Sequence, residues 1–185
     1  MLTLRYKITR EDYINYYTYV TWDAPENLQK RRKYFLKHLG IIVLFTGMFY
    51  FTGLFDRSSI FAFLVIAFIL LTTLVSMTGI RSSINKQAQT LSDDPYNSSI
   101  FLPTVLTASD TGILLQDELT ETNCKWQAFV KKQENKDYYF LFFNALQAIV
   151  IPKRVFRNTA EKSQFDKLLS QFISLEAEVG SIKES

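Results

Sequence analysis

The fold is decided by residues 39–80, LGIIVLFTGMFYFTGLFDRSSIFAFLVIAFILLTTLVSMTGI. Two apolar runs, 39–55 and 60–80, are separated by only four residues, Asp56 to Ser59. As helices, the runs would be about 25 Å and about 31 Å long, and a hydrocarbon core is about 30 Å thick. Because four residues cannot carry the chain across a bilayer, the runs predict a tight antiparallel transmembrane hairpin. The alternative is a pair of core helices in a soluble protein, but residues 60–71 lack the polar stripe that such helices usually keep.

Basic side chains flank the hairpin on its two outer sides, whereas the loop between the runs holds only Arg57. Because cytoplasmic flanks are enriched in Lys and Arg, this distribution predicts two spans with both termini in the cytoplasm. The same charges would attract anionic lipid headgroups. The candidate lipid contacts are Lys30, Arg31, Arg32, Lys33, Lys37 and Arg81 around the hairpin, together with Lys153 and Arg154. The alternatives are that the flank only sets the topology and that Lys153 and Arg154 are simply exposed between a strand and a helix.

The arm before the hairpin, residues 1–38, predicts a strand followed by helices. Residues 2–8 alternate apolar and polar side chains, which is typical of a half-buried strand. Thr9, with acidic residues directly after it, predicts the start of a helix. Five aromatic side chains then recur at helical spacing up to Trp22, and we expect this face to pack on the soluble domain or to lie at the headgroups. A ligand-binding aromatic box is the alternative.

The chain after the hairpin predicts a helix extension and linker over residues 81–99 and a β-rich domain over residues 100–185. Turn signals divide this domain into strands at 100–108, 113–119, 122–132, 138–143 and 148–151. Asn158, with Glu161 three residues later, predicts the cap of a last amphipathic helix. We therefore predict an α+β membrane protein with one curved antiparallel sheet closed by a helix, as in a pleckstrin-homology-like (PH-like) barrel. The N-terminal strand could add to that sheet, and the sequence leaves open whether it does.

This order of elements resembles the YcxB-like family of bacterial membrane proteins. The most specific pieces are Trp126, within KWQAFVKKQENKDYYFLF, and the segment IPKRVF at residues 151–156. The resemblance implies the architecture and a location in the bacterial cytoplasmic membrane. It supplies no catalytic residues.

The motifs of common enzyme classes are missing from the sequence. It contains no P-loop, no dinucleotide-binding glycine motif, no nucleophile elbow and no H-E-x-x-H. With one His and one Cys, we expect no catalytic, cofactor-binding or metal-binding residues. Asp93 and Asp94, and the acidic group around Asp117, are expected in solvated turns. The basic excess lies in residues 1–91 and the acidic excess in residues 92–185, which argues against a nucleic-acid partner.

These features favour a non-enzymatic, membrane-anchored interaction or scaffolding module, with its PH-like domain held at the cytoplasmic leaflet. The expected partners are the lipid bilayer, anionic headgroups, and a membrane protein or a second copy of the chain. The alternative is an accessory subunit of a membrane transport, export or toxin-protection assembly, because small residues such as Gly40, Gly47, Thr72 and Ser76 allow close helix packing. An enzyme would require a cleft that gathers Lys153 and Arg154 with acidic residues.

Overall fold

The computed structural model describes residues 1–51 and 59–173 of the 185-residue chain. Residues 52–55 of the first apolar run and residues 56–58 of the predicted four-residue loop lie outside the described residues, whereas Ser59 begins a helix. The chain forms two compact units. One unit contains Met1–Tyr13 and Ser92–Ser185, and the other contains Ile14–Leu91. The β-rich unit is thus built from both ends of the chain, with the helical unit inserted between them.

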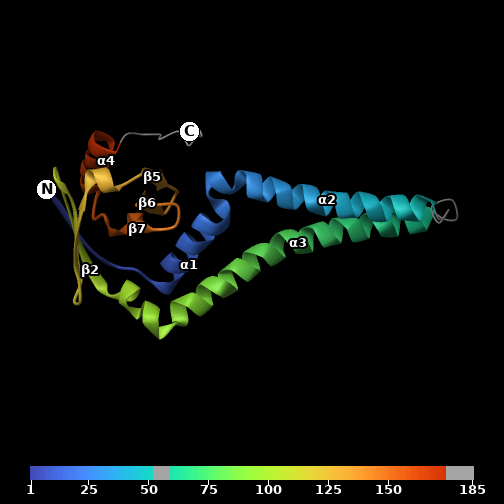
Figure 1. The fold of residues 1–185 in the computed structure, drawn as a ribbon, viewed down its shortest axis with the longest axis horizontal. Helices are drawn as coiled ribbons and strands as arrows, with labels where there is room; N and C mark the ends of the chain where they lie inside the picture. The colour runs from blue at the N-terminus through green and yellow to red at the C-terminus, as the bar shows by residue number, and fades with distance from the viewer. Residues whose placement is uncertain (52–58, 174–185) are drawn as a thin grey trace, which may run out of the picture. The chain divides into compact units, whose positions relative to one another are not determined.

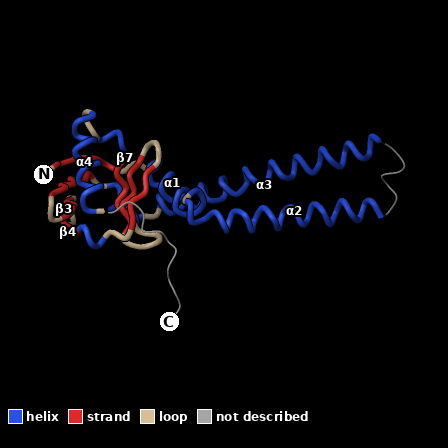
Figure 2. Tube along the Cα trace, turned by 90° about the horizontal axis from the view of Figure 1, so that it is seen from above, coloured by secondary structure: helices blue, strands red, loops and turns tan. Residues whose placement is uncertain are grey.

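The helical unit contains the helices that the two apolar runs predict. Helix α1 (Arg10–Thr18) continues as a π-helical turn at Tyr19–Asp23 and, after a short 3-10 turn, leads to α2 (Leu28–Phe51). Helix α3 (Ser59–Asp93) runs alongside α2 in the opposite direction (Figures 1 and 2). Within residues 1–51 and 59–173, no helix combines the length and apolarity that a membrane crossing requires.

The first sheet of the β-rich unit joins the two ends of the chain. Its order is β1 (Leu2–Lys7), β2 (Pro103–Ser109), β3 (Gly112–Gln116) and β4 (Glu121–Lys125), with all neighbours antiparallel. Leu2 pairs with Ala108 and Lys7 pairs with Pro103. The alternation predicted for β1 is confirmed, because its two leucines are buried between exposed polar residues. Strand β1 thus joins the sheet of the C-terminal domain, a point that the sequence had left open.

The second sheet contains β5 (Lys131–Glu134), β6 (Tyr138–Phe142) and β7 (Ala148–Pro152), again antiparallel. Every residue of β6 is buried. Helix α4 (Thr159–Phe172) follows, and its Phe165 and Leu169 are fully buried in the core shared with both sheets. The cap is as predicted, since the Asn158 side chain accepts a hydrogen bond from the Glu161 N–H at 2.8 Å.

The prediction of one strand over residues 122–132 is wrong. Strand β4 ends at Lys125, a 3-10 turn occupies Trp126–Ala128, and β5 begins at Lys131. Trp126 and Phe129 are both buried, although residues three apart point to opposite faces of a continuous strand. The turn brings both rings inward and moves the chain from one sheet to the next. The domain therefore has two antiparallel sheets in place of the single curved sheet that we predicted.

Two strand boundaries also differ from the prediction. Residues 95–101 form a 3-10 helix, so β2 begins at Pro103 and not at residue 100. Proline has no N–H to donate to a ladder and suits the first position of a strand. Strand β3 ends at Gln116, because Asp117 accepts hydrogen bonds from the N–H groups of Leu119 and Thr120 and closes a turn.

Candidate functional site

Six of the eight candidate lipid contacts lie in the helical unit. Lys30, Arg31, Arg32, Lys33 and Lys37 all occupy the first half of α2, and Arg81 lies on α3. The Arg81 guanidinium forms an ion pair with Asp23 at 2.7 Å. Lys30 donates to the backbone oxygen of Thr21 at 3.3 Å. The structure therefore brings the predicted basic flank together at one part of the helical unit.

The π-helical turn is tied to both long helices of this unit. The Asn27 amide donates to the Val20 carbonyl at 2.7 Å, and the rings of Trp22 and Tyr34 meet edge to face at 6.1 Å. On the α3 side, the Thr18 hydroxyl donates to the Asn85 side chain at 2.8 Å. A π-helical segment widens the helix and leaves backbone carbonyls in need of partners. Here, Asn27 of the 3-10 turn donates to the Val20 carbonyl and Lys30 of α2 donates to the Thr21 carbonyl, so the π-helical turn has a defined position beside the start of α2.

Arg154 makes the most extensive polar contact of the β-rich unit. It follows β7 in a 3-10 turn at Lys153–Val155, and its two terminal nitrogens donate to both carboxylate oxygens of Asp12 at 2.6 and 2.5 Å. The Asp12 side chain is only 2% exposed, whereas that of Arg154 is 52% exposed. The Tyr138 hydroxyl also donates to Asp12 at 2.8 Å. A strand end, a helix start and a turn that are far apart in sequence thus meet at one carboxylate.

Asp12 also forms a reciprocal cap with Thr9 at the start of α1. The Thr9 N–H and hydroxyl both donate to the Asp12 carboxylate, at 2.7 and 2.8 Å, and the Asp12 N–H donates back to the Thr9 hydroxyl at 3.1 Å. Burial alone would raise the pKa of Asp12, but the hydrogen bonds from Arg154, Thr9 and Tyr138 outweigh it and lower the pKa to about 2. The carboxylate is therefore charged at neutral pH.

Lys153 is held by partners within the same unit. Its ammonium donates to the Asn135 carbonyl at 2.5 Å, lies 3.7 Å from the Glu134 carboxylate and sits 4.8 Å from the centre of the Tyr139 ring. The Lys153 side chain is 20% exposed. An anion that captured Lys153 and Arg154 would leave the Asp12 carboxylate buried without its cation, which costs several kcal/mol. These contacts favour a structural role for the pair over a phosphate-binding one.

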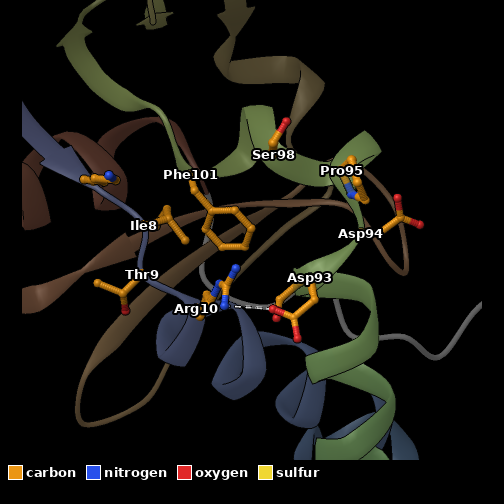
Figure 3. A pocket seen from close by; sticks show the side chains of 10 residues that line it. Ile8, Thr9, Arg10, Asp93, Asp94, Pro95, Ser98 and Phe101 are labelled. Atoms are coloured by element: carbon orange, nitrogen blue, oxygen red, sulfur yellow. Dashed lines mark ion pairs between the residues drawn. The ribbon is translucent and has the colours of Figure 1, made fainter.

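A pocket of about 330 Å³ opens in the β-rich unit beside the ends of β1 and α3. Figure 3 shows the side chains of Arg10 and Asp93 pointing toward one another, and their charged atoms are 2.8 Å apart. Both side chains are more than half exposed, so this ion pair contributes little to stability. The pocket is lined by Lys7, Ile8, Thr9, Arg10, Ser92, Asp93, Asp94, Pro95, Ser98 and Phe101.

The acidic residues of this pocket are occupied by local contacts. Asp94 caps the 3-10 helix that follows it by accepting from the Tyr96 N–H at 3.0 Å. Asp93 pairs with Arg10. In the described part of the chain, no group of three or more His, Cys, Asp or Glu side chains is arranged to hold a metal ion. The pocket therefore offers polar and charged contacts to a small solute without a recognisable reactive group.

Asp12 was not among the predicted site residues, although it is the centre of this polar network. Its local role was detectable, because Thr9 followed three residues later by an acidic side chain is a capping pattern. Its contact with Arg154 was not detectable, since 142 residues separate the two positions. Isolated from its partners, Asp12 looks like an ordinary acidic residue in the first turn of a helix.

A known protein family matches the segment of the chain that contains Trp126, Tyr138 and Arg154. Residues 108–169 match the model of the YcxB-like protein family. The YcxB-like region is about a third of the chain and extends from the end of β2 into α4. It contains Arg154, whereas the partner Asp12 lies outside it, in the N-terminal segment. Searches among curated proteins and among solved structures found no match.

Proposed function

We propose that this protein is a non-enzymatic interaction or scaffolding module anchored in the bacterial cytoplasmic membrane by α2 and α3. In this proposal, the β-rich unit acts at the cytoplasmic leaflet, where it binds a membrane-protein partner or lipid headgroups. The main support is the sequence of residues 39–80, in which both apolar runs are free of charged side chains. The match of residues 108–169 to the YcxB-like protein family agrees with the resemblance seen in the sequence, which implies a bacterial membrane protein.

The observation that carries the topology is the pairing of β1 with β2. Lys7 and Pro103 are register partners at one end of this pair, so the inserted segment, residues 8–102, leaves and re-enters the sheet at neighbouring positions. A segment that returns to its starting point must cross a membrane an even number of times. This geometry supports two spans with both termini on one side, independently of the positive charges that flank the runs.

Exposed apolar side chains on the two long helices further support an anchor. On α2 they include Leu39, Val43, Leu44, Phe45, Met48 and Phe51, and on α3 they include Leu64, Phe68, Leu71 and Val75. Phe51 is 89% exposed and Leu44 is 68% exposed. Such a continuous apolar surface is unfavourable in water and marks a contact with lipid or protein. Lipid is the simplest occupant, since it covers all sides of a helix pair.

The PH-like character of the β-rich unit is part of the proposal. It is supported by the four-stranded and three-stranded antiparallel sheets and by the C-terminal helix α4, which contributes to the core that both sheets share. Strands β1 and β4 are the edge strands of the first sheet, and an edge strand can pair with a strand of a partner. This feature supports an interaction role for the unit.

Cysteine labelling in intact cells tests the topology. Cys124 is only 6% exposed, so we would replace it with Ala and introduce single reporters as Ser58→Cys and Lys136→Cys. A membrane-impermeant maleimide should label the first reporter from outside and the second only after permeabilisation. Labelling of Lys136→Cys in intact cells would overturn the orientation. Release of the full chain from membranes by an alkaline wash would overturn the anchor itself.

The second candidate is an accessory subunit of a membrane transport, export or toxin-protection assembly. It is favoured by three glycines of the long helices, Gly40, Gly47 and Gly79, because a Cβ at any of them would meet no described atom within 4 Å. Open small-residue positions allow a further span to approach closely. Native-gel migration after mild extraction tests this candidate. A Gly40→Leu/Gly47→Leu variant should lose a larger co-migrating complex, and a wild-type chain that migrates alone would exclude the candidate.

A further inference from the structure

Three lysines share one exposed face of α2. Lys30, Lys33 and Lys37 are spaced by three and by seven residues along a continuous helix, which places them within an arc of about 60°. All three are exposed. Arg32 lies about 200° around the helix from Lys30, and Arg31 is only partly exposed. The five basic residues of this segment are therefore not evenly distributed around the axis of α2, because the three lysines lie on one side.

An aromatic pair lies beside these lysines. Tyr34 follows Lys33 on α2, is 41% exposed and meets the Trp22 ring edge to face at 6.1 Å. Lys30 is bonded to the Thr21 carbonyl of the π-helical turn that carries Trp22. The turn therefore holds Trp22 next to the lysines. Trp and Tyr side chains are enriched at the headgroup level of membranes, because they combine an apolar ring with a polar group.

We propose that the lysine face, defined as Lys30, Lys33 and Lys37 with Tyr34 and Trp22, binds the phosphate groups of anionic phospholipids. This inference rests on the proposed membrane anchor and names the lipid class that the anchor recognises. Charge complementarity selects an anionic headgroup, and the adjacent aromatic pair places the face at the depth of the headgroups. Free phosphate would not use the aromatic rings, so the occupant to which the face is matched is a lipid.

The electrostatics around the lysine face favour this occupant. The neighbouring carboxylate of Asp23 is engaged by Arg81 at 2.7 Å, which reduces its competition for the lysines. By contrast, Lys153 and Arg154 are held by Glu134 and Asp12 in the β-rich unit. Among the candidate lipid contacts, the lysine face thus combines exposure, positive charge and an aromatic neighbour. Each exposed lysine near an anionic surface should increase affinity about fivefold.

Trp22 provides a direct readout of the lipid at this face. The full chain would be reconstituted in bilayers of phosphatidylcholine that contain brominated phosphatidylglycerol, or brominated phosphatidylcholine as the neutral reference. Bromine quenches a tryptophan that it contacts, so the ratio of quenching by the two lipids gives their relative affinity at Trp22. The chain has two tryptophans, and Trp126 is only 3% exposed in the core of the β-rich unit. A Trp22→Phe variant measures the background from Trp126.

We expect the wild-type chain to prefer phosphatidylglycerol at least fivefold at Trp22, and Lys30→Gln/Lys33→Gln/Lys37→Gln to reduce the preference to about one. The matched control, Lys125→Gln/Lys136→Gln/Lys167→Gln, removes the same charge from exposed lysines of the β-rich unit and should keep the preference. In the Trp22→Phe background, unchanged Trp126 emission would show that the β-rich unit of each variant is folded, and unchanged helical circular dichroism would show the same for the helical unit. The single variant Arg32→Gln, on the opposite side of α2, should also keep the preference.

Three outcomes would overturn the lysine face. They are a preference that survives the triple substitution on α2, an equal loss in the matched control, and no quenching of Trp22 by either lipid. An alkaline wash of the same bilayers separates this failure from failure of the anchor. A chain that stays in the bilayer but shows no preference refutes only the lysine face, whereas a chain that is released refutes the anchor as well.

Discussion

The contact between Arg154 and Asp12 predicts an unequal cost for removing its two partners. Arg154→Gln leaves the Asp12 carboxylate, 2% exposed, without its cation, and an uncompensated buried charge of this kind costs about 3–5 kcal/mol. Asp12→Asn leaves the Arg154 guanidinium unpaired, but its side chain is 52% exposed and water can solvate it. The pKa of Asp12 falls from 3.8 to about 2 on folding, so the loss of its charge should cost about 2 kcal/mol at neutral pH.

The double variant gives the most decisive comparison. In the Asp12→Asn background, removing Arg154 no longer leaves an unpaired charge in the interior. We therefore expect Asp12→Asn/Arg154→Gln to be more stable than Arg154→Gln alone, by about 1 kcal/mol or more. Two destabilising changes would then combine to restore stability, which is a result that independent contacts do not produce.

Equilibrium urea unfolding of the full chain in detergent measures these differences. A Trp22→Phe background leaves Trp126, in the core of the β-rich unit, as the only tryptophan. Arg157→Gln is the matched control, because the exposed Arg157 lies three residues from Arg154, and it should change the free energy of unfolding by no more than about 0.5 kcal/mol. Costs below about 1 kcal/mol for Arg154→Gln, or a double variant that equals the sum of the single ones, would refute the reasoning.

Three further predictions concern the β-rich unit. Gly112→Ala should cost at least about 3 kcal/mol in urea unfolding, because the residue has a φ of +152° and its new Cβ would lie 2.2 Å from the Cys124 carbonyl oxygen. Asn158→Ala should cost about 1 kcal/mol in the same assay, because α4 loses the bond to the Glu161 N–H. The Asp12 contribution should be complete above about pH 4 and disappear as the pH falls through about 2, so acid titration should unfold Asp12→Asn less steeply than the wild type.

Each of these predictions has a clear contrary result. Thr111→Ala, next to Gly112 in the same turn, provides a comparison for the glycine, and equal stability of the two variants would contradict the steric argument. An Asn158→Ala variant with wild-type stability would show that water replaces the cap. If the wild type and Asp12→Asn respond identically to acid between pH 4 and pH 2, other carboxylates govern acid unfolding.

Most local elements were predictable because their signals are local. The alternation in residues 2–8 indicated β1, and the pair Asn158 and Glu161 indicated the start of α4. The one strand that was predicted wrongly shows the limit of this reasoning. Residues 122–132 have the composition of a strand, but the inward packing of Trp126 and Phe129 requires a 3-10 turn between two sheets. That packing depends on Ser109 and Phe172, which contact Trp126 from distant parts of the chain.

The candidate site was only partly predictable. The sequence placed all five basic residues of α2 beside an apolar run, and helical geometry then distributes them around the axis. The special position of the lysine face depends on Trp22, which the π-helical turn brings against Tyr34. If α1 continued as a regular α-helix, the indole of Trp22 would point in a different direction and would not meet Tyr34. The sequence therefore predicted the charges, and the tertiary structure selected the lysines that share a face with the aromatic pair.

The sequence by itself determined where most strands and helices form and that the chain has a long apolar insertion, because periodicity, caps and turn residues act over a few positions. Only the tertiary structure decided that β1 completes a sheet with β2 across this insertion and that Asp12 receives Arg154 from 142 residues away. The hydrophobic pattern of a sequence predicts that a side chain faces the core. It does not predict which residue that side chain contacts there. These contacts form only when the whole chain folds around one core, and at that step the buried Asp12 carboxylate pairs with the half-exposed Arg154 guanidinium.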